Sequence, residues 1–320
     1  MNPQCQDVEC YAHEGESCRL GEVDHTQCAK WTNVAPGTEP ETATPSTPAA
    51  ARVCWSGSAL GLADIANLTP RARSILIGVL GAYDAGKTTL LIGNYLQLLR
   101  GNTLADAHFA GSRTLGAWES LAAWTRYDDV VRPPRFPPHT PRGTSRVPGL
   151  LHFALRGAHD EFRDILLTDA PGEWFTRWAI KTDAPGAEGA CWIAEKADAF
   201  LVFADCARLS GPKRGEARDD LCQLLERLGN EVSLRPTALV WAKDDQTVPE
   251  RIQDTLRKVL NERIPQATEV RASITRPQSL VDVLASVIRP AWTAPLAKPL
   301  IEPVLYHHAF AAFRGHHASA

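Results

Sequence analysis

A glycine-rich loop between an apolar run and the start of an apolar helix restricts the fold of this chain more than any other segment. Residues 74–92 read SILIGVLGAYDAGKTTLLI, in which Gly81, four further residues and Gly86-Lys87-Thr88 match the phosphate-loop pattern without a mismatch. A strand, this loop and a helix, in that order, place backbone N–H groups and a helix N-terminus around a phosphate. The segment therefore predicts binding of a nucleoside triphosphate.

Each position of the loop has a predicted role. Glycines let the backbone wrap closely around a phosphate. Lys87 would reach the β- and γ-phosphates, and the Thr88 hydroxyl would ligate Mg²⁺. The predicted phosphate-binding set is Gly81, Asp84, Ala85, Gly86, Lys87, Thr88 and Thr89.

Composition indicates an intracellular enzyme or switch. The 320 residues leave room for one large α/β domain with appendages, and the net charge of −3 does not indicate a nucleic acid partner. We find no apolar run of the roughly 18 residues that a membrane span requires, and no secretory leader after Met1. The expected compartment is the cytoplasm.

The chain divides by composition into four parts. Residues 1–32 are rich in cysteine and histidine, and residues 33–50 are rich in proline, threonine and alanine, as in a linker. Residues 51–292 are apolar and regular, and residues 293–320 form a C-terminal extension. Residues 101–149 form a long insertion within the main domain, for which we expect a helix at 115–124 and a cover over the nucleotide.

Strand-like and helical patterns alternate in the main domain. This alternation predicts a mostly parallel sheet with helices on both faces. The runs at 150–155 and 164–169 are exceptional because the short GAHDE segment between them is too short for a crossover, so they should form an antiparallel hairpin. The expected strands are 74–80, 150–155, 164–169, 199–204, 237–242 and 269–272, and the expected helices are near 87–100, 187–197, 215–229, 249–262 and 279–289.

Two motifs follow later strands. In Asp169-Ala-Pro-Gly172-Glu173, an Asp at a strand end can hold the water shell of Mg²⁺, and Gly172 can offer its N–H to the γ-phosphate. In Ala242-Lys243-Asp244-Asp245, the Asp245 carboxylate can accept two hydrogens from a guanine edge, which adenine does not offer. The alternatives are an ordinary turn for the first motif and a solvated strand end for the second.

These three motifs in order resemble the P-loop GTPases, and among them the translation-factor-like (TRAFAC) class. FAGSRTLGAWESLA at 109–122 and TPRGTSRVPGLLHFALR at 140–156 further resemble bacterial double-GTPases of conflict and phage-defence gene neighbourhoods, in which a Cys-rich module often precedes the GTPase. The resemblance covers roughly residues 74–290.

The resemblance implies GTP and GDP as ligands with Mg²⁺ on Thr88 and Asp169, and hydrolysis at a centre of Lys87, Asp169, Gly172 and Glu173. It assigns the base to Lys243 and Asp245, with Ser273 packing from the other side, and leaves three candidates for a switch threonine. It also implies protein partners, either a companion GTPase or effector or a second copy of the chain. The switch candidates are Thr114, Thr140 and Thr144.

Two departures from the family pattern predict slow unaided hydrolysis. Glu173 stands where many small GTPases carry a water-orienting glutamine, and a carboxylate there repels the γ-phosphate. Tyr83 stands where they keep a glycine, and its ring would crowd an arginine supplied in trans. We therefore expect a low intrinsic turnover that dimerisation or a partner stimulates.

The N-terminal cysteines form a separate hypothesis. Four thiolates in a segment without a core of its own can hold a tetrahedral Zn²⁺, with His25 as an alternative ligand. The alternative is a set of free thiols, since the paired C-x2-C spacing is missing. The predicted ligands are Cys5, Cys10, Cys18 and Cys28.

Two other functions remain open at this point. The chain could be an ATP-hydrolysing P-loop protein in which the AKDD sequence is accidental. It could also be a scaffold that binds a nucleotide structurally and hydrolyses nothing.

Overall fold

The computed structural model describes residues 4–5, 24, 27–32, 59–65, 74–126, 136, 148–158 and 161–293. The chain separates into two compact units, residues 1–50 and 51–320. In the first unit, strand β1 (Gln4–Cys5) pairs antiparallel with β2 (Trp31–Thr32), which puts Cys5 opposite Trp31. Cys28 is buried with a free thiol. The other predicted zinc ligands, Cys10, Cys18 and His25, lie outside the described residues, as do the predicted linker at 33–50 and most of the C-terminal extension.

The second unit contains one seven-stranded sheet in the order β4-β5-β6-β3-β7-β8-β9. The strands from β6 to β9 in this order run parallel, whereas β5 is antiparallel to β6 and β4 is antiparallel to β5. The predicted hairpin is therefore confirmed. The strand bounds are β3 Ser74–Gly81, β4 His108–Gly111, β5 Gly149–Arg156, β6 Phe162–Asp169, β7 Ala199–Asp205, β8 Thr237–Ala242 and β9 Thr268–Ala272.

Strand β4 is the one strand of this sheet that the sequence did not predict. It is four residues long, alternates between exposed and half-buried positions, and shifts register against β5 between Phe109 and Gly111. Gly111 has a φ of 136°, which favours glycine. A strand this short at a sheet edge leaves too weak an apolar pattern to be recognised in the sequence.

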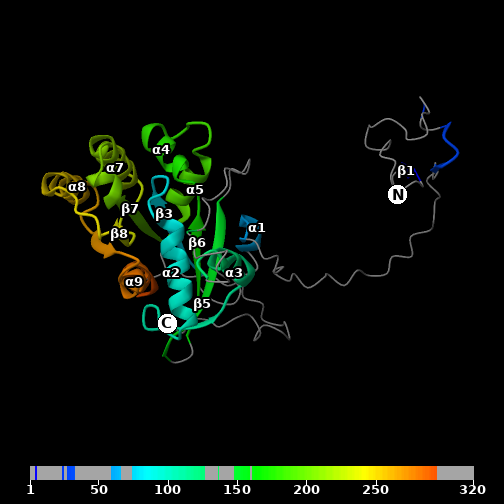
Figure 1. Cartoon of the computed structure of the whole chain (residues 1–320), viewed down its shortest axis with the longest axis horizontal. Coiled ribbons are helices and arrows are strands. Elements are labelled where there is room, and N and C mark those ends of the chain that lie inside the picture. The colour runs from blue at the N-terminus through cyan, green and yellow to red at the C-terminus, as the bar shows by residue number, and fades with distance from the viewer. Residues whose placement is uncertain are drawn as a thin grey trace, which may run out of the picture. The chain divides into compact units, whose positions relative to one another are not determined.

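Helices cover both faces of the sheet, as Figure 1 shows. Every residue of the central strands β7 and β8 is buried because both faces carry a core. One core cluster lies under α2, α3 and α9, and the other under the helices from α4 to α8. The helix bounds are α1 Leu62–Ile65, α2 Lys87–Leu99, α3 Leu115–Ala123, α4 Gly172–Ile180, α5 Glu188–Lys196, α6 Cys206–Ser210, α7 Arg214–Gly229, α8 Glu250–Arg263 and α9 Pro277–Thr293.

All five helices expected to alternate with the strands are confirmed, and the helix expected at 115–124 is α3. Three helices were not predicted, namely α1, α4 and α6, which have four, nine and five residues. Helices α1 and α6 are too short to show a helical period, whereas α4 is as long as α3 and α5, which the sequence did predict. None of the helices in the described ranges is long and apolar enough to cross a bilayer.

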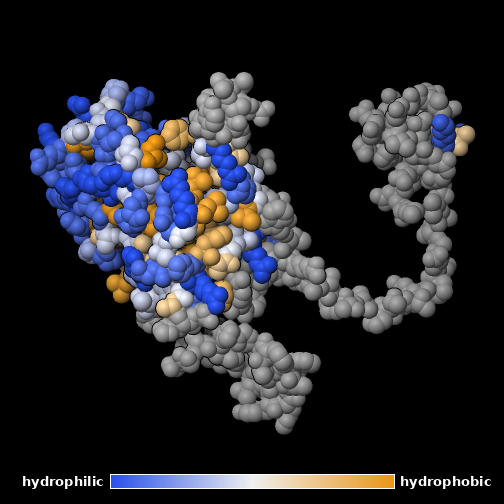
Figure 2. Space-filling view, turned by 60° about the horizontal axis from the view of Figure 1, so that its bottom comes forward, coloured by the Kyte–Doolittle hydropathy of each residue, from blue (hydrophilic) through white to orange (hydrophobic). Residues whose placement is uncertain are grey.

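Side chains of both charge signs occur on the surface of the second unit, and Figure 2 shows hydrophilic and hydrophobic residues interspersed on one face of it. On α8, oppositely charged side chains pair one turn apart, as in Arg257 with Asp254 at 3.8 Å and Lys258 with Glu262 at 4.0 Å. This mixture agrees with the nearly balanced charge of the whole chain.

A buried polar hub fixes α3 to the sheet. The Arg113 N–H donates to His152 Nδ1 at 2.9 Å, so His152 Nε2 carries the ring proton and faces Asp164 Oδ1 at 2.9 Å. The His152 carbonyl accepts from Trp118 Nε1 at 2.9 Å, and the Trp118 ring stacks on Phe153. His152 and Asp164 are 1% and 0% exposed. The start of the 101–149 insertion is therefore part of the core.

We predict that Asp164→Ala lowers the free energy of unfolding by about 2–4 kcal/mol, because it leaves the buried Nε2–H of His152 without an acceptor. Urea denaturation followed by circular dichroism measures this loss. Asp183→Ala is the matched control, since Asp183 pairs with Lys181 at 3.4 Å but is 73% exposed, and its loss should cost under about 0.5 kcal/mol. Equal costs for the two variants would contradict the prediction.

Candidate functional site

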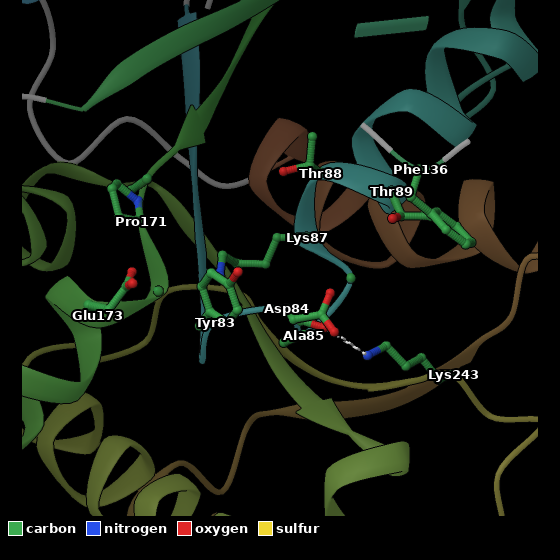
Figure 3. Close-up of a pocket in the computed structure, with 13 residues that line it drawn as sticks. Tyr83, Asp84, Ala85, Lys87, Thr88, Thr89, Phe136, Pro171, Glu173 and Lys243 are labelled. Carbon is green, nitrogen blue, oxygen red and sulfur yellow. Dashed lines mark hydrogen bonds and ion pairs between the residues drawn. The ribbon is translucent and has the colours of Figure 1, made fainter. Parts of the chain in front are cut away.

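A cavity of about 530 Å³ opens at the carboxyl ends of β3 and β6. The predicted phosphate-binding residues line it together with the residues after β6 (Figure 3). This position is where sheets of this kind bind ligands. The lining residues are Tyr83, Asp84, Ala85, Gly86, Lys87, Thr88, Thr89, Phe136, Ala170, Pro171, Gly172, Glu173 and Lys243.

Gly81 is the one predicted phosphate-binding residue outside this lining. It is the buried last residue of β3, with a φ of 151°, and a Cβ there would stand 2.7 Å from the Cβ of Phe203. A glycine is required at position 81 because β3 packs closely on β7 there.

The backbone of the loop turns through left-handed conformations. Asp84 has a φ of 58° and Gly86 a φ of 88°. Helix α2 begins at Lys87, and Gly86 caps it without a side-chain hydrogen bond. The first N–H groups of α2 therefore remain available at a helix end that attracts anions.

Lys87 lies across the loop that it belongs to. Its Nζ donates to the carbonyl oxygens of Gly81 at 3.0 Å and Ala82 at 2.8 Å. Burial lowers the pKa of Lys87 to about 8, and the carboxylates of Asp169, Glu173 and Asp84 oppose that shift. A partly buried cation beside three carboxylates is suited to a ligand that brings both negative charge and metal ions.

Gly172 touches the phosphate loop directly. A Cβ at Gly172 would stand 2.3 Å from the Tyr83 nitrogen and 2.4 Å from the Ala82 carbonyl carbon. These neighbours are backbone atoms, so a side chain here would force the two loops apart. Helix α4 begins at Gly172, and Glu173 in its first turn lines the cavity. The segment after Asp169 is thus the first turn of a helix that abuts the phosphate loop.

The residues predicted to hold Mg²⁺ fit that ion. Thr88 lines the cavity, and Asp169 ends β6 and acts electrostatically on Lys87. Mg²⁺ prefers oxygen ligands and is usually held by one or two carboxylates together with substrate phosphates. The described residues contain no cluster of three or more His, Cys, Asp or Glu that would hold a metal without a ligand.

A second cavity, of about 330 Å³, adjoins the first and shares Gly86, Thr89, Phe136 and Lys243 with it. Asp245 and Ser273, which were predicted to contact a base from opposite sides, both line this second cavity. The Ser273 hydroxyl donates to Asp245 Oδ1 at 3.0 Å, so the loops after β8 and β9 meet at this point. Hydrogen bonds from Gln246, the Asp245 backbone and Ser273 hold the pKa of Asp245 below its ordinary value, so its carboxylate is an ionised acceptor at neutral pH.

Lys243 joins the ends of three strands. Its Nζ donates to the Asp84 carbonyl oxygen at 2.8 Å and lies 3.1 Å from Asp205 Oδ2. Asp205, which the sequence analysis missed, is the last residue of β7 and caps α6 by accepting from the Ala207 N–H. An Asp at the end of the apolar run AFLVFAD carries the same signal as Asp169. That signal could have identified it.

Two other predicted positions show where the chain departs from expectation. Ala242 is buried against the loop, with its Cβ 3.9 Å from the place of a Cβ on Gly86, so it makes no polar contact there. Thr114 is fully buried, and its hydroxyl accepts from the His152 N–H at 2.9 Å. It therefore does not face the cavity. The other two switch candidates, Thr140 and Thr144, lie outside the described residues.

We predict that Lys87→Met stabilises the ligand-free protein by about 1 to 3 kcal/mol at pH 7, because it removes a cation whose charged form burial disfavours. Between pH 8 and 10.5 the folded chain holds fewer protons at Lys87 than the unfolded chain does. The stability of the unaltered protein should therefore rise with pH across this interval, and the gain of the variant should vanish above it.

Thermal unfolding at a series of pH values checks this prediction. Lys181→Met is the control, because its side chain is 68% exposed, and it should change little. The same Lys87 variant should lose all stabilisation by added nucleoside triphosphate. A destabilised Lys87 variant would show that its two hydrogen bonds outweigh the cost of burial.

Comparison with known proteins places the chain in a family. A comparison with curated proteins gave no match. The model of the family described as Double-GTPase 2 matches residues 75–293, more than half of the 320 residues. The match covers the sheet from β3 onward and both cavities. The chain therefore belongs to the Double-GTPase 2 family, and this membership supports a GTP-binding protein.

Proposed function

We propose that this protein is a switch that binds GTP with Mg²⁺ and hydrolyses it slowly to GDP. The observation that carries the proposal is the join between the two cavities. Lys87, Thr88 and Gly172 surround the first, and Asp245 with Ser273 stands in the second. A nucleoside triphosphate with its phosphates in the first cavity would place its base in the second cavity. There the ionised Asp245 carboxylate can accept hydrogen bonds from the edge of the base.

The roles follow from the geometry. Lys87 exchanges its two carbonyl acceptors for phosphate oxygens. The attraction between its charge and the phosphates then offsets the free-energy cost of desolvating the lysine. The Gly172 N–H, at the start of α4, donates to the γ-phosphate and links its presence to the position of α4. Mg²⁺ held by Thr88 and Asp169 would neutralise charge on the phosphates. Loss of the γ-phosphate then frees α4 to move, which is the switch.

Slow unaided turnover is consistent with Tyr83 and Glu173. Both line the phosphate cavity, and Tyr83 is 46% exposed. Figure 3 shows the two side chains on the same side of Lys87. The Glu173 carboxylate repels the γ-phosphate, and the Tyr83 ring occupies space that an incoming arginine needs. We therefore propose that this protein is a GTPase of the TRAFAC class whose hydrolysis is stimulated by a companion GTPase, an effector or a second copy of the chain, in a bacterial conflict or defence system.

An ATP-dependent activity is the competing proposal, and Ala242 favours it. The guanine-reading motif carries Asn or Thr at this position, and Ala242 supplies neither a donor nor an acceptor. Only Asp245 then separates guanine from adenine. The two proposals differ in what a change at Asp245 should do.

We predict that Asp245→Asn weakens GDP binding by roughly a hundredfold, because an amide cannot accept two hydrogens from the guanine edge. Binding of xanthosine diphosphate should improve, since its 2-oxo group accepts from the new amide. Competition titrations with GDP, ADP and xanthosine diphosphate measure this exchange, and released phosphate from GTP measures turnover. ADP binding that matches GDP binding in the unaltered protein would favour the ATP-dependent activity.

We also propose Zn²⁺ in the first unit, held by Cys5, Cys10, Cys18 and Cys28, with His25 as an alternative to one thiolate. Pairing of β1 with β2 places Cys5 opposite Trp31, three residues after Cys28, so the backbone brings two of the four proposed ligands near each other. We expect about one zinc per chain, and Cys28→Ser should lower that content. Elemental analysis of protein purified without chelator gives the number, and less than about half an equivalent would count against the site.

A further inference from the structure

Asp244 is turned away from the base cavity, although it stands between two residues that line it. Lys243 and Asp245 both belong to the lining, whereas Asp244 does not. Its side chain is only 11% exposed, and Asp245 next to it is exposed. A carboxylate withdrawn from solvent at this point requires compensation within the protein.

Two arginines, one in β9 and one in the loop after it, supply that compensation. Arg271 Nη1 lies 2.5 Å from Asp244 Oδ1, and Arg276 Nη2 contacts Oδ2. The Asp244 N–H also donates to the Ala272 carbonyl oxygen at 3.1 Å. The loop after β8 is thus joined to the end of β9 by one backbone bond and one charge-assisted bond, and to the loop after β9 by a second charge-assisted bond. Charge-assisted bonds are stronger than neutral ones.

The arginines are held in their turn. Arg271 Nη2 donates to Gln253 Oε1 on α8 at 3.1 Å, and its guanidinium lies 5.8 Å from the ring centroid of the fully buried Trp241. The Arg276 N–H donates to the Ser273 carbonyl oxygen at 3.0 Å, which closes the turn that carries the Ser273 hydroxyl. These contacts therefore connect the buried Trp241 with the two loops that carry Asp245 and Ser273, the residues expected to contact the base.

We propose that Asp244, through Arg271 and Arg276, is a positioning residue that sets the base selectivity of the nucleotide site. The inference rests on the proposed function, since it assumes that a purine enters the second cavity. Hydrogen bonds from a guanine edge to Asp245 depend steeply on angle and distance, so a small shift of the loop weakens them. The phosphate loop lies outside this set of contacts, so its contribution to phosphate affinity should not change.

The test uses the full chain with Asp244→Asn and a matched control. Asp106→Asn is that control, because Asp106 pairs with Arg289 through two contacts at 2.7 and 3.2 Å, away from both cavities. Affinities are measured for GDP and for inosine diphosphate. Inosine diphosphate differs only in lacking the exocyclic amine, from which Asp245 would accept a hydrogen bond. We expect the GDP to inosine diphosphate affinity ratio to fall about tenfold in Asp244→Asn and to stay unchanged in Asp106→Asn.

The ratio separates positioning from simple destabilisation. A protein that is merely less stable loses affinity for both nucleotides alike, and its ratio does not move. Arg276→Gln provides a second variant whose folding is not at risk, since the Arg276 side chain is 56% exposed. It should lower the ratio in the same direction. Amide exchange without nucleotide should show lost protection at 243–246 and 273–276 in both variants.

The outcomes distinguish this inference from the proposed function. If the unaltered protein prefers GDP and both variants keep its ratio, the positioning role is overturned and the GTP-binding function survives. If the unaltered protein shows no preference for guanine, the proposed function fails and the selectivity role fails with it. Amide exchange then reports whether the arginine contacts serve the fold alone.

Discussion

The contact between Gly172 and the backbone of residues 82–83 determines how this molecule can work. It exists because β3 and β6 are parallel neighbours, paired from Ser74 with Asp164 onward, so their carboxyl ends deliver two loops to one place. The loops meet without room for a side chain. Any ligand seated on the first loop is therefore within reach of the start of α4. Coupling between ligand and helix requires no long relay of residues, only this one apposition.

The same sheet order explains the division of the site. The strand β7 separates the end of β3 from the end of β8, and Lys243 bridges that separation through Asp84 and Asp205. The half proposed to hold phosphate is built on backbone conformation and one partly buried lysine. The half proposed to hold the base is built on side-chain ion pairs and hydroxyls at the last two strands. In the proposed function, affinity for the phosphates and selectivity for the base would therefore depend on different parts of the fold and on different kinds of interaction.

Much of this arrangement could be predicted from the sequence because the strands are long, apolar runs that a parallel sheet buries on both faces. The helix at 115–124 and the hairpin could be predicted from period and spacing. Strand β4 and helix α6 could not, since four or five residues show no clear period. Helix α4, which is as long as α3, begins at a glycine, which is a poor helix former. Within the site, motifs identified residues adjacent along the chain, such as Lys87 with Thr88. Contacts between distant segments, such as Asp205 with Lys243 or His152 with Asp164, are set by tertiary packing, which no local pattern encodes.

Ala242 stands where the guanine-reading motif carries Asn or Thr, and this replacement changes which contacts hold the loop after β8. A polar side chain here would tie the base loop to the phosphate loop, but Ala242 offers only van der Waals contact near Gly86. The contacts that remain at this loop include several ion pairs. Lys243 reaches Asp84 and Asp205 on one side, and Asp244 holds two arginines on the other. Three of these partners, Asp84, Arg271 and Arg276, are about half exposed or more, so salt screens them more than it screens a buried amide bond. Ionic strength should therefore act on base discrimination in this protein more than it would if an asparagine made the tie.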